Sequence, residues 1–89
     1  MSGFEGMDVD QVKQLSTHLD QASQNILQLA QQLTAALDSA NWKGPDREAF
    51  VSNWHSAHLA ALNNVGHSTH DAATAARRNA QEQETASSH

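Results

Sequence analysis

The stretch NWKGPDREAF, residues 41–50, decides the fold, because it interrupts a long helical pattern in the middle of the chain. Gly44 precedes Pro45, and the residue before a proline is driven out of the helical backbone region. Proline itself suits the first position of a new helix, with Gly44 as its N-cap. Asp46 adds an acidic side chain where the helix dipole favours negative charge. The stretch therefore predicts a short turn at residues 41–45 followed at once by a second helix.

Upstream of the turn, the sequence predicts a long amphipathic helix that begins at Asp8. Asp8 can cap the first helical turn, with Gln11 three residues further on as in a capping box. Apolar side chains then recur at steps of three and four residues, which is the spacing of one helix face. These positions are Val12, Leu15, Leu19, Ala22, Ile26, Leu29, Leu33, Ala36 and Ala40. The pattern predicts a packed helix on the order of 50 Å long.

Downstream of the turn, a second helix is predicted from Pro45 to about Gln81, with a weaker apolar pattern. Its apolar positions are Phe50, Trp54, Ala57, Ala61, Val65, Ala72 and Ala75 or Ala76, flanked by Leu59 and Leu62. Gly66 lies in the middle of this helix and costs roughly 1 kcal/mol relative to alanine, so a weak point is expected there. The polar tail, residues 82–89, is expected to be disordered, and the N-terminal segment 1–7 is expected to be flexible.

Helices joined by so short a loop are normally antiparallel neighbours, so the predicted fold class is all-α, a two-helix hairpin over residues 8–81. A hairpin of this size cannot enclose a core, and a contiguous apolar stripe left in water usually marks an interface. We therefore expect two hairpins, identical or related, to pair into a four-helix bundle. The residues expected to form the core and dimer interface are Leu15, Leu19, Ile26, Leu29, Leu33, Phe50, Trp54 and Leu62.

The composition argues against several classes of function. The 89 residues carry a formal net charge of −5 with only five Lys and Arg, so no nucleic-acid partner is expected. The chain has no Cys, which excludes disulfides and thiolate chemistry. No stretch approaches the roughly 18 apolar residues that a membrane span needs. Residues 1–7 lack the basic and apolar regions of a conventional signal peptide.

No pattern in the sequence indicates catalysis or a cofactor, since there is neither a nucleophile elbow nor a Gly-rich phosphate loop. The protein is therefore expected not to be an enzyme. His67, His70 and Asp71 share a helix face in a possible metal-ligand arrangement. The first helix offers only His18 beside them, so no metal site is predicted. Protonation of all six histidines would change the formal charge from −5 to +1, so a response to mild acid is a separate hypothesis.

The turn and its flanks resemble the WXG family, the small early-secreted-antigen-like proteins that type VII (ESX-like) secretion systems export. The likeness rests on Trp42-Lys43-Gly44 at mid-chain between two helical segments. It extends over WKGPDREAFVSNW, residues 42–54, which is similar to a stretch common among actinobacterial members. The tail RRNAQEQETAS, residues 77–87, is also similar to the ends of such proteins.

This resemblance implies a hairpin that dimerises into an antiparallel four-helix bundle, with itself or with a paralogous WXG-type partner. It implies export as a folded dimer that a secretion ATPase recognises, with Trp42 and Gly44 as recognition residues. The protein would then be secreted without a conventional signal peptide, and otherwise cytoplasmic. It would act by protein–protein binding as a secreted substrate, a co-secreted partner or an adaptor for a larger effector.

The chain departs from the family in one respect. Many members carry a Tyr-x-x-x-Asp/Glu export signal after the second helix, and this sequence contains no Tyr. The positions that would precede Glu82 and Glu84 by four residues hold Arg78 and Ala80. Two interpretations stay open. A partner supplies the tyrosine, or the chain is an intracellular structural coiled-coil adaptor with no export role.

Overall fold

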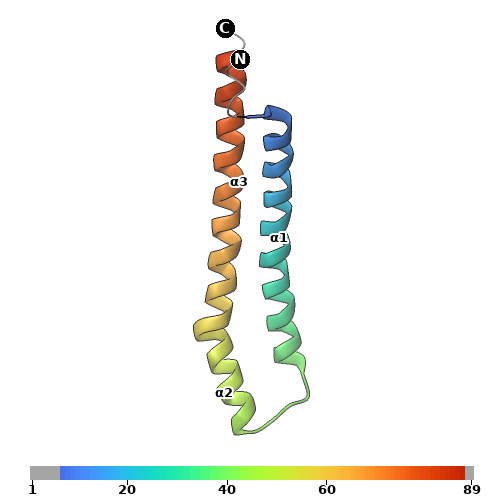
Figure 1. Cartoon of the computed structure of the whole chain (residues 1–89). Coiled ribbons are helices and arrows are strands. Elements are labelled where there is room, and N and C mark those ends of the chain that lie inside the picture. Colours follow the sequence, from blue (N-terminus) through green and yellow to red (C-terminus); the bar gives the residue numbers. More distant parts are fainter. Residues whose placement is uncertain (1–6, 88–89) are drawn as a thin grey trace.

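The computed structural model describes residues 7–87, which form an antiparallel helical hairpin (Figure 1). Helix α1 spans Val9–Ser39. The returning segment consists of α2, Pro45–Asn53, a π-helical turn at Trp54–His58, and α3, Leu59–Ser87. No strand occurs among the described residues. The molecule measures 66 × 17 × 15 Å, which makes it a rod. The predicted all-α hairpin is confirmed.

Helix α1 begins where the sequence predicts, because Asp8 caps it. The Asp8 carboxylate accepts a hydrogen bond of 3.1 Å from the backbone N–H of Gln11, which satisfies one of the free donors of the first turn. At the other end, Ala40 takes an extended conformation, and its N–H donates to the Leu37 carbonyl. The segment 1–7, expected to be flexible, lies outside the described residues except for its last residue.

The turn confirms the predicted roles of Gly44 and Pro45. Gly44 is the N-cap of α2 and has a φ of 117°, a conformation that L side chains rarely adopt. Its carbonyl accepts a 3.2 Å hydrogen bond from the N–H of Glu48, which closes the first turn of α2. Pro45 is the first residue of α2, where a backbone N–H would have no partner within the helix, so the N–H that proline lacks costs no hydrogen bond.

The two long helices meet along a seam of small side chains rather than along the predicted leucines. The seam consists of Ser16, Ser23 and Ala30 on α1 and Gly66, Ala73 and Ala80 on α3, all of them buried. On each helix these residues recur every seven positions, which keeps them on the line that faces a neighbouring helix. Small side chains at the contact allow the two backbones to approach closely.

Gly66 is a packing position within the continuous helix α3, and the weak point expected there stays a prediction. A Cβ placed on Gly66 would lie 2.5 Å from Cδ2 of Leu27, closer than two such atoms approach in real structures. Across the same contact, the buried Ser23 hydroxyl donates a 2.7 Å hydrogen bond to the Gly66 carbonyl. The close approach of α1 and α3 therefore favours glycine here, despite its lower helix propensity.

The end of the second helix also differs from the sequence expectation. Helix α3 continues to Ser87 instead of ending near Gln81, so most of the tail expected to be disordered is helical. Glu84 forms a 2.8 Å ion pair with Lys13 at the start of α1. The tail is rich in Ala, Gln and Glu, which are good helix formers, and this contact with α1 adds to their propensity.

Candidate interaction surface

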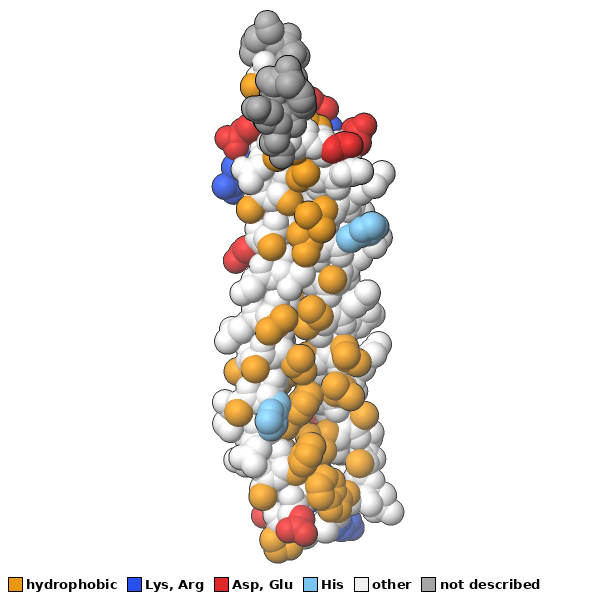
Figure 2. All heavy atoms as spheres, viewed as in Figure 1, with side chains coloured by type: hydrophobic (Ala, Val, Ile, Leu, Met, Phe, Trp, Pro, Cys, Tyr) orange, Lys and Arg blue, Asp and Glu red, His pale blue; other side chains and the backbone are white. Residues whose placement is uncertain are grey.

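One flank of the seam is an exposed apolar face. On α1 it contains residues that stand one position before or three positions after a seam residue, namely Leu15, Leu19, Ala22, Ile26, Leu29 and Leu33. Helix α3 contributes Leu62, Val65 and Ala72 on the same flank, and α2 contributes Phe50. Leu19 lines one shallow groove together with Val65 and Ala72, which joins the two helices into a single surface. Figure 2 shows hydrophobic side chains along the viewed face of the rod, over both helices.

Several large side chains of this apolar face are about half exposed. Leu15 is 50% exposed, Leu29 49%, Phe50 49% and Val65 52%. Single exposed leucines are ordinary on protein surfaces, whereas a contiguous row of them indicates a binding surface. The row follows most of the hairpin.

The opposite flank of the seam is polar and is closed by bonds between the helices. Asp20 of α1 accepts a 2.8 Å hydrogen bond from Arg77 and lies 3.0 Å from Nδ1 of His70. Lys13 and Glu84 form the ion pair described above at the open end of the hairpin. Because the cross-links between the helices lie on this polar flank, the apolar face remains free of them.

These ion pairs change the acidity of their members. The hydrogen bond from Arg77, with a second contribution from His70, holds the pKa of Asp20 below its ordinary value. The hydrogen bond to Glu84 raises the pKa of Lys13. Both groups are partly exposed to solvent, so the pairs orient the helices more than they strengthen the fold.

The π turn gives Trp54 its position. The N–H of Leu59 donates to the Trp54 carbonyl five residues earlier, which is the hydrogen bond of a π-helix. The Trp54 indole N–H donates a 2.7 Å hydrogen bond to Oγ1 of Thr34 on α1. The His58 ring stacks at a tilt beside Trp54, with 6.4 Å between the ring centroids. The sequence pattern predicts a continuous helix here and gives no sign of this π turn.

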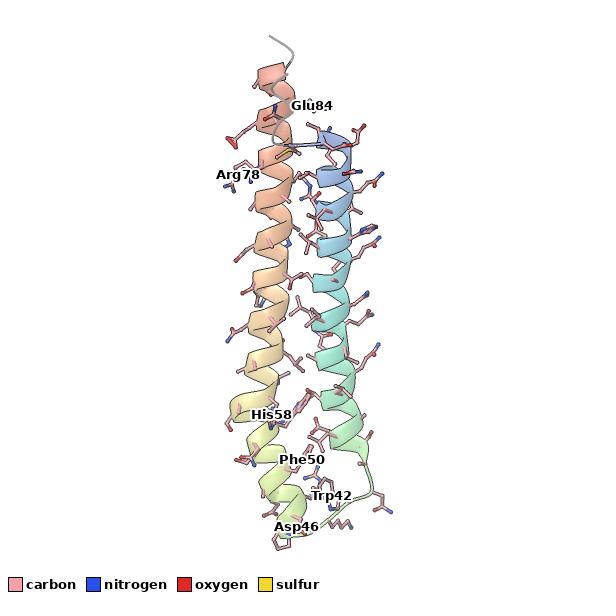
Figure 3. The ribbon with its side chains drawn as sticks, viewed as in Figure 1. Trp42, Asp46, Phe50, His58, Arg78 and Glu84 are labelled. Atoms are coloured by element: carbon pink, nitrogen blue, oxygen red, sulfur yellow. The ribbon has the colours of Figure 1, made fainter. Side chains whose placement is uncertain are left out.

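The turn end presents the two predicted recognition residues, Trp42 and Gly44. Trp42 is 39% exposed, and its ring lies 5.6 Å from the ring of Phe50 at 57°, a tilted aromatic contact. Figure 3 shows Trp42 on the turn and Phe50 on α2, both at this end of the hairpin. Trp42 and Gly44 line a hollow together with Asp38 and Arg47. Trp42 is thus partly packed and partly available for contact.

A belt without formal charge crosses the middle of the rod. Residues 21–37 and 49–70 contain no Asp, Glu, Lys or Arg, and the antiparallel hairpin sets these two stretches side by side (Figure 1). The formal charges gather at the two ends. A partner that covers the middle of the apolar face would therefore bury no formal charge, which removes the largest desolvation penalty of association.

The residues predicted for assembly occupy two environments. Leu15, Leu29, Leu33 and Phe50 are exposed, whereas Leu19, Ile26, Trp54 and Leu62 are partly buried at the edge of the contact between helices. None of the eight belongs to the seam. Their predicted role within the hairpin is therefore secondary, and their role in a dimer interface stays a prediction. The seven-residue recurrence of Ser16, Ser23 and Ala30 is the sequence signal that indicates the seam.

The histidines form no metal centre in the part of the chain that the structure describes, where no group of three His, Asp or Glu side chains could hold an ion. His70 pairs instead with Asp20, an acidic partner on α1 that sequence reasoning did not find. Within residues 7–87, none of the helices has the length and hydropathy of a membrane-crossing segment.

Comparison with known proteins identifies no relative of this chain, since no family model, no curated protein and no solved structure matches it.

Proposed function

We propose that this protein is a WXG-type helical hairpin that acts by protein–protein binding in association with type VII secretion. The observation that carries the proposal is the apolar face, which lies beside a seam that already joins the two helices. Seam and polar flank hold α1 against α3. The half-exposed leucines are therefore available for a second molecule.

The partner that fits this face best is a second copy of the chain. The apolar face follows α1 from Leu15 to the turn, about 36 Å at 1.5 Å per residue, and the rod is 17 Å wide. Pairing would thus bury on the order of 600 Å² per copy, or 1,200 Å² in total, at the lower bound for a specific stable interface. Two hairpins joined in this way make a four-helix bundle.

The distribution of charge favours an antiparallel arrangement of the two copies. The turn end, residues 38–48, holds three acidic and two basic side chains, a net charge of −1. The open end, residues 8–20 and 71–84, holds six acidic and three basic side chains, a net charge of −3. Antiparallel pairing sets each strongly charged end beside a weakly charged one, which lowers the repulsion relative to parallel pairing.

The mass of the purified chain in solution tests the binding part of the proposal. Light scattering after size exclusion, with circular dichroism of the same sample, should give a helical species of about twice the 9.6 kDa chain mass. A well-folded helical monomer at micromolar concentration would contradict docking of a second copy. A poorly folded monomer would indicate instead that a paralogous chain covers the apolar face.

The link to secretion is supported by the turn, where Trp42 is partly exposed beside Gly44. Its test is detection of the chain in the culture filtrate of an actinobacterial host, with the type VII apparatus intact and then disrupted. Export should require the apparatus, and Trp42→Ala should retain the folded protein in the cells. Export that persists without the apparatus would contradict this part of the proposal.

A second candidate function is an intracellular structural coiled-coil adaptor with no export role. The absence of Tyr from the sequence favours it, because the tyrosine half of the composite export signal cannot come from these 89 residues. Retention in the cells of a host with an active apparatus, also when a tyrosine-bearing paralogue is co-produced, would favour the adaptor. Export only with the paralogue would favour the secretion-associated function.

A further inference from the structure

The π turn adds one residue to the second helical segment at a defined place, between the aromatic side chains and the seam. Trp54 precedes the seam residue Gly66 by twelve positions. In an uninterrupted α-helix, at about 100° per residue, Trp54 would point about 120° away from the direction of Gly66. Because the π turn absorbs one residue, eleven α-helical steps remain and the deviation falls to about 20°.

The same correction decides where Phe50 points. Phe50 precedes Gly66 by sixteen positions, so an uninterrupted helix would place it about 160° away, on the far side from α1. With one residue absorbed, the deviation is about 60°, in the direction of Leu62 and Val65 on the apolar face. The observed contacts agree, since Trp54 reaches Thr34 of α1 and Phe50 meets Trp42.

We propose that the π turn is the positioning element of the docking surface. It turns Phe50 onto the apolar face and Trp54 inward onto α1, so that a second copy meets one continuous apolar row from the open end to the turn. This inference rests on the proposed function, because the second copy is the partner that the row serves.

Apart from the π turn, few features of this end could determine the directions of Phe50 and Trp54. Neither α2 nor the π turn contains a buried residue. The Trp54–Thr34 hydrogen bond joins Trp54 to α1, and the other two contacts described above, Trp42–Phe50 and Trp54–His58, join rings within this end. The helical phase between Phe50 and the seam therefore sets the surface that a partner meets.

Two variants of the full chain that change only this phase test the proposal. Deletion of Ser56, an exposed residue of the π turn, leaves eleven positions between Trp54 and Gly66, so an ordinary α-helix keeps both aromatic side chains in place. Insertion of one alanine between Ser56 and Ala57 turns both of them away by a further step of about 100°. Association is measured by sedimentation, and helicity by circular dichroism.

The dimer of the deletion variant should have a Kd within about threefold of the wild-type value. Its thermal stability should be equal or higher, because a turn of α-helix has better hydrogen-bond geometry than a π-helical turn. The insertion variant should remain helical but dimerise about tenfold more weakly, because Phe50 leaves the interface. Equal dimerisation of the insertion variant and the wild type would overturn the proposal.

A second measurement separates this inference from the proposed function. In a Trp42→Phe background, Trp54 is the sole tryptophan and reports its own surroundings. Its emission should match the wild-type background in the deletion variant and shift to longer wavelength in the insertion variant. If the wild type is monomeric but the shift occurs, docking of a second copy is wrong and the positioning of the aromatic residues stands. If emission does not respond to the insertion, the positioning role is wrong, whatever the oligomeric state.

Discussion

The body of this hairpin and its turn end contrast in the side chains that they use for contact. Where α1 meets α3, the fully buried residues are Ser, Ala and Gly, and many of the larger apolar side chains lie on one flank. At the turn end, α2 and the π turn carry Phe50 and Trp54, yet none of their residues is buried. Small side chains therefore hold the hairpin together, and large ones cover its outside. In a rod this thin, the small residues that stabilise the contact between the helices differ from the large apolar residues that form the exposed surface.

The largest expected effect comes from breaking the close contact of the seam. Gly66→Val places a side chain against Leu27, where even a Cβ would lie at 2.5 Å, and should destabilise the hairpin by about 2 to 4 kcal/mol. Thermal and urea melts followed by circular dichroism measure this loss. Ala60→Val, on the exposed surface of the same helix, is the matched control and should change stability little. Equal stability of the two variants would show that the seam is not closely packed.

A smaller loss is expected at the turn, where the backbone conformation, not packing, is the constraint. Gly44→Ala puts a side chain on a residue with φ 117° and ψ 177°, which should cost on the order of 2 kcal/mol. There is open space around this position, so the loss would be due to backbone strain alone. Lys43→Ala, one residue earlier, serves as control in the same urea melts. A Gly44→Ala protein as stable as the control would argue against this turn geometry.

A change on the apolar face should separate binding from folding. Leu29→Asp introduces a charge into a half-exposed position and should weaken dimerisation by tenfold or more, about 1.4 kcal/mol, while leaving the helicity of the hairpin intact. Gln28→Asp adds the same charge at an exposed polar position next to it. Sedimentation of both variants over a concentration series gives the comparison. If the two charges weaken association equally, the apolar face is not the interface.

The hydrogen bond that ties the π turn to α1 should contribute less. Thr34→Val removes the acceptor of the Trp54 indole N–H and should destabilise the turn end by about 1 kcal/mol. A shift of Trp54 emission in a Trp42→Phe background locates the change. Thr69→Val is the control, because the Thr69 hydroxyl bonds to Val65 within its own helix. A loss as large in the control would point to helix propensity instead of the bond between helices.

The smallest effect is expected at the polar flank and depends on pH. The pKa of Asp20 is lowered in the folded protein, chiefly by Arg77. Its stabilising contribution is therefore complete above the ordinary carboxyl value and is lost as pH falls through the lowered pKa. Melts between neutral pH and pH 2 should show a shallower acid loss for Asp20→Asn than for the wild type. Asp38→Asn should keep the wild-type slope, and an unchanged slope in both variants would show that the pair does not matter.

The parts of the fold that depend on neighbouring residues could be predicted from sequence. Asp8 caps α1, and Gly44 with Pro45 makes the turn, because each acts on a backbone that it directly adjoins. The seam could not be found by looking for the most apolar positions. Close packing of two helices selects small side chains, so Ser23 and Gly66 are buried while Leu29 is not.

The candidate site was predictable to a similar extent. Trp42 and Gly44 lie together at the turn as their sequence spacing suggests, but the direction of Phe50 depends on a helical phase measured from a seam residue sixteen positions away. Unless the seam is known, the direction of Phe50 cannot be measured relative to α1, and a continuous helix is the simplest prediction. The end of α3 was missed for a related reason, because Glu84 meets Lys13 across the hairpin.

The even repeat of the seam has a consequence for how the hairpin finds its alignment. Small residues recur every seven positions on both helices, so a slide of α1 along α3 by one repeat, about 10.5 Å, would bring similar side chains together again. Within the seam, only Gly66, whose missing Cβ leaves room for Leu27, differs clearly from the positions one repeat away. In the observed alignment, Asp20 pairs with Arg77 and His70, and Lys13 pairs with Glu84. Partly exposed pairs of this kind add little stability, but together with Gly66 and the short turn they favour the observed alignment over its neighbours.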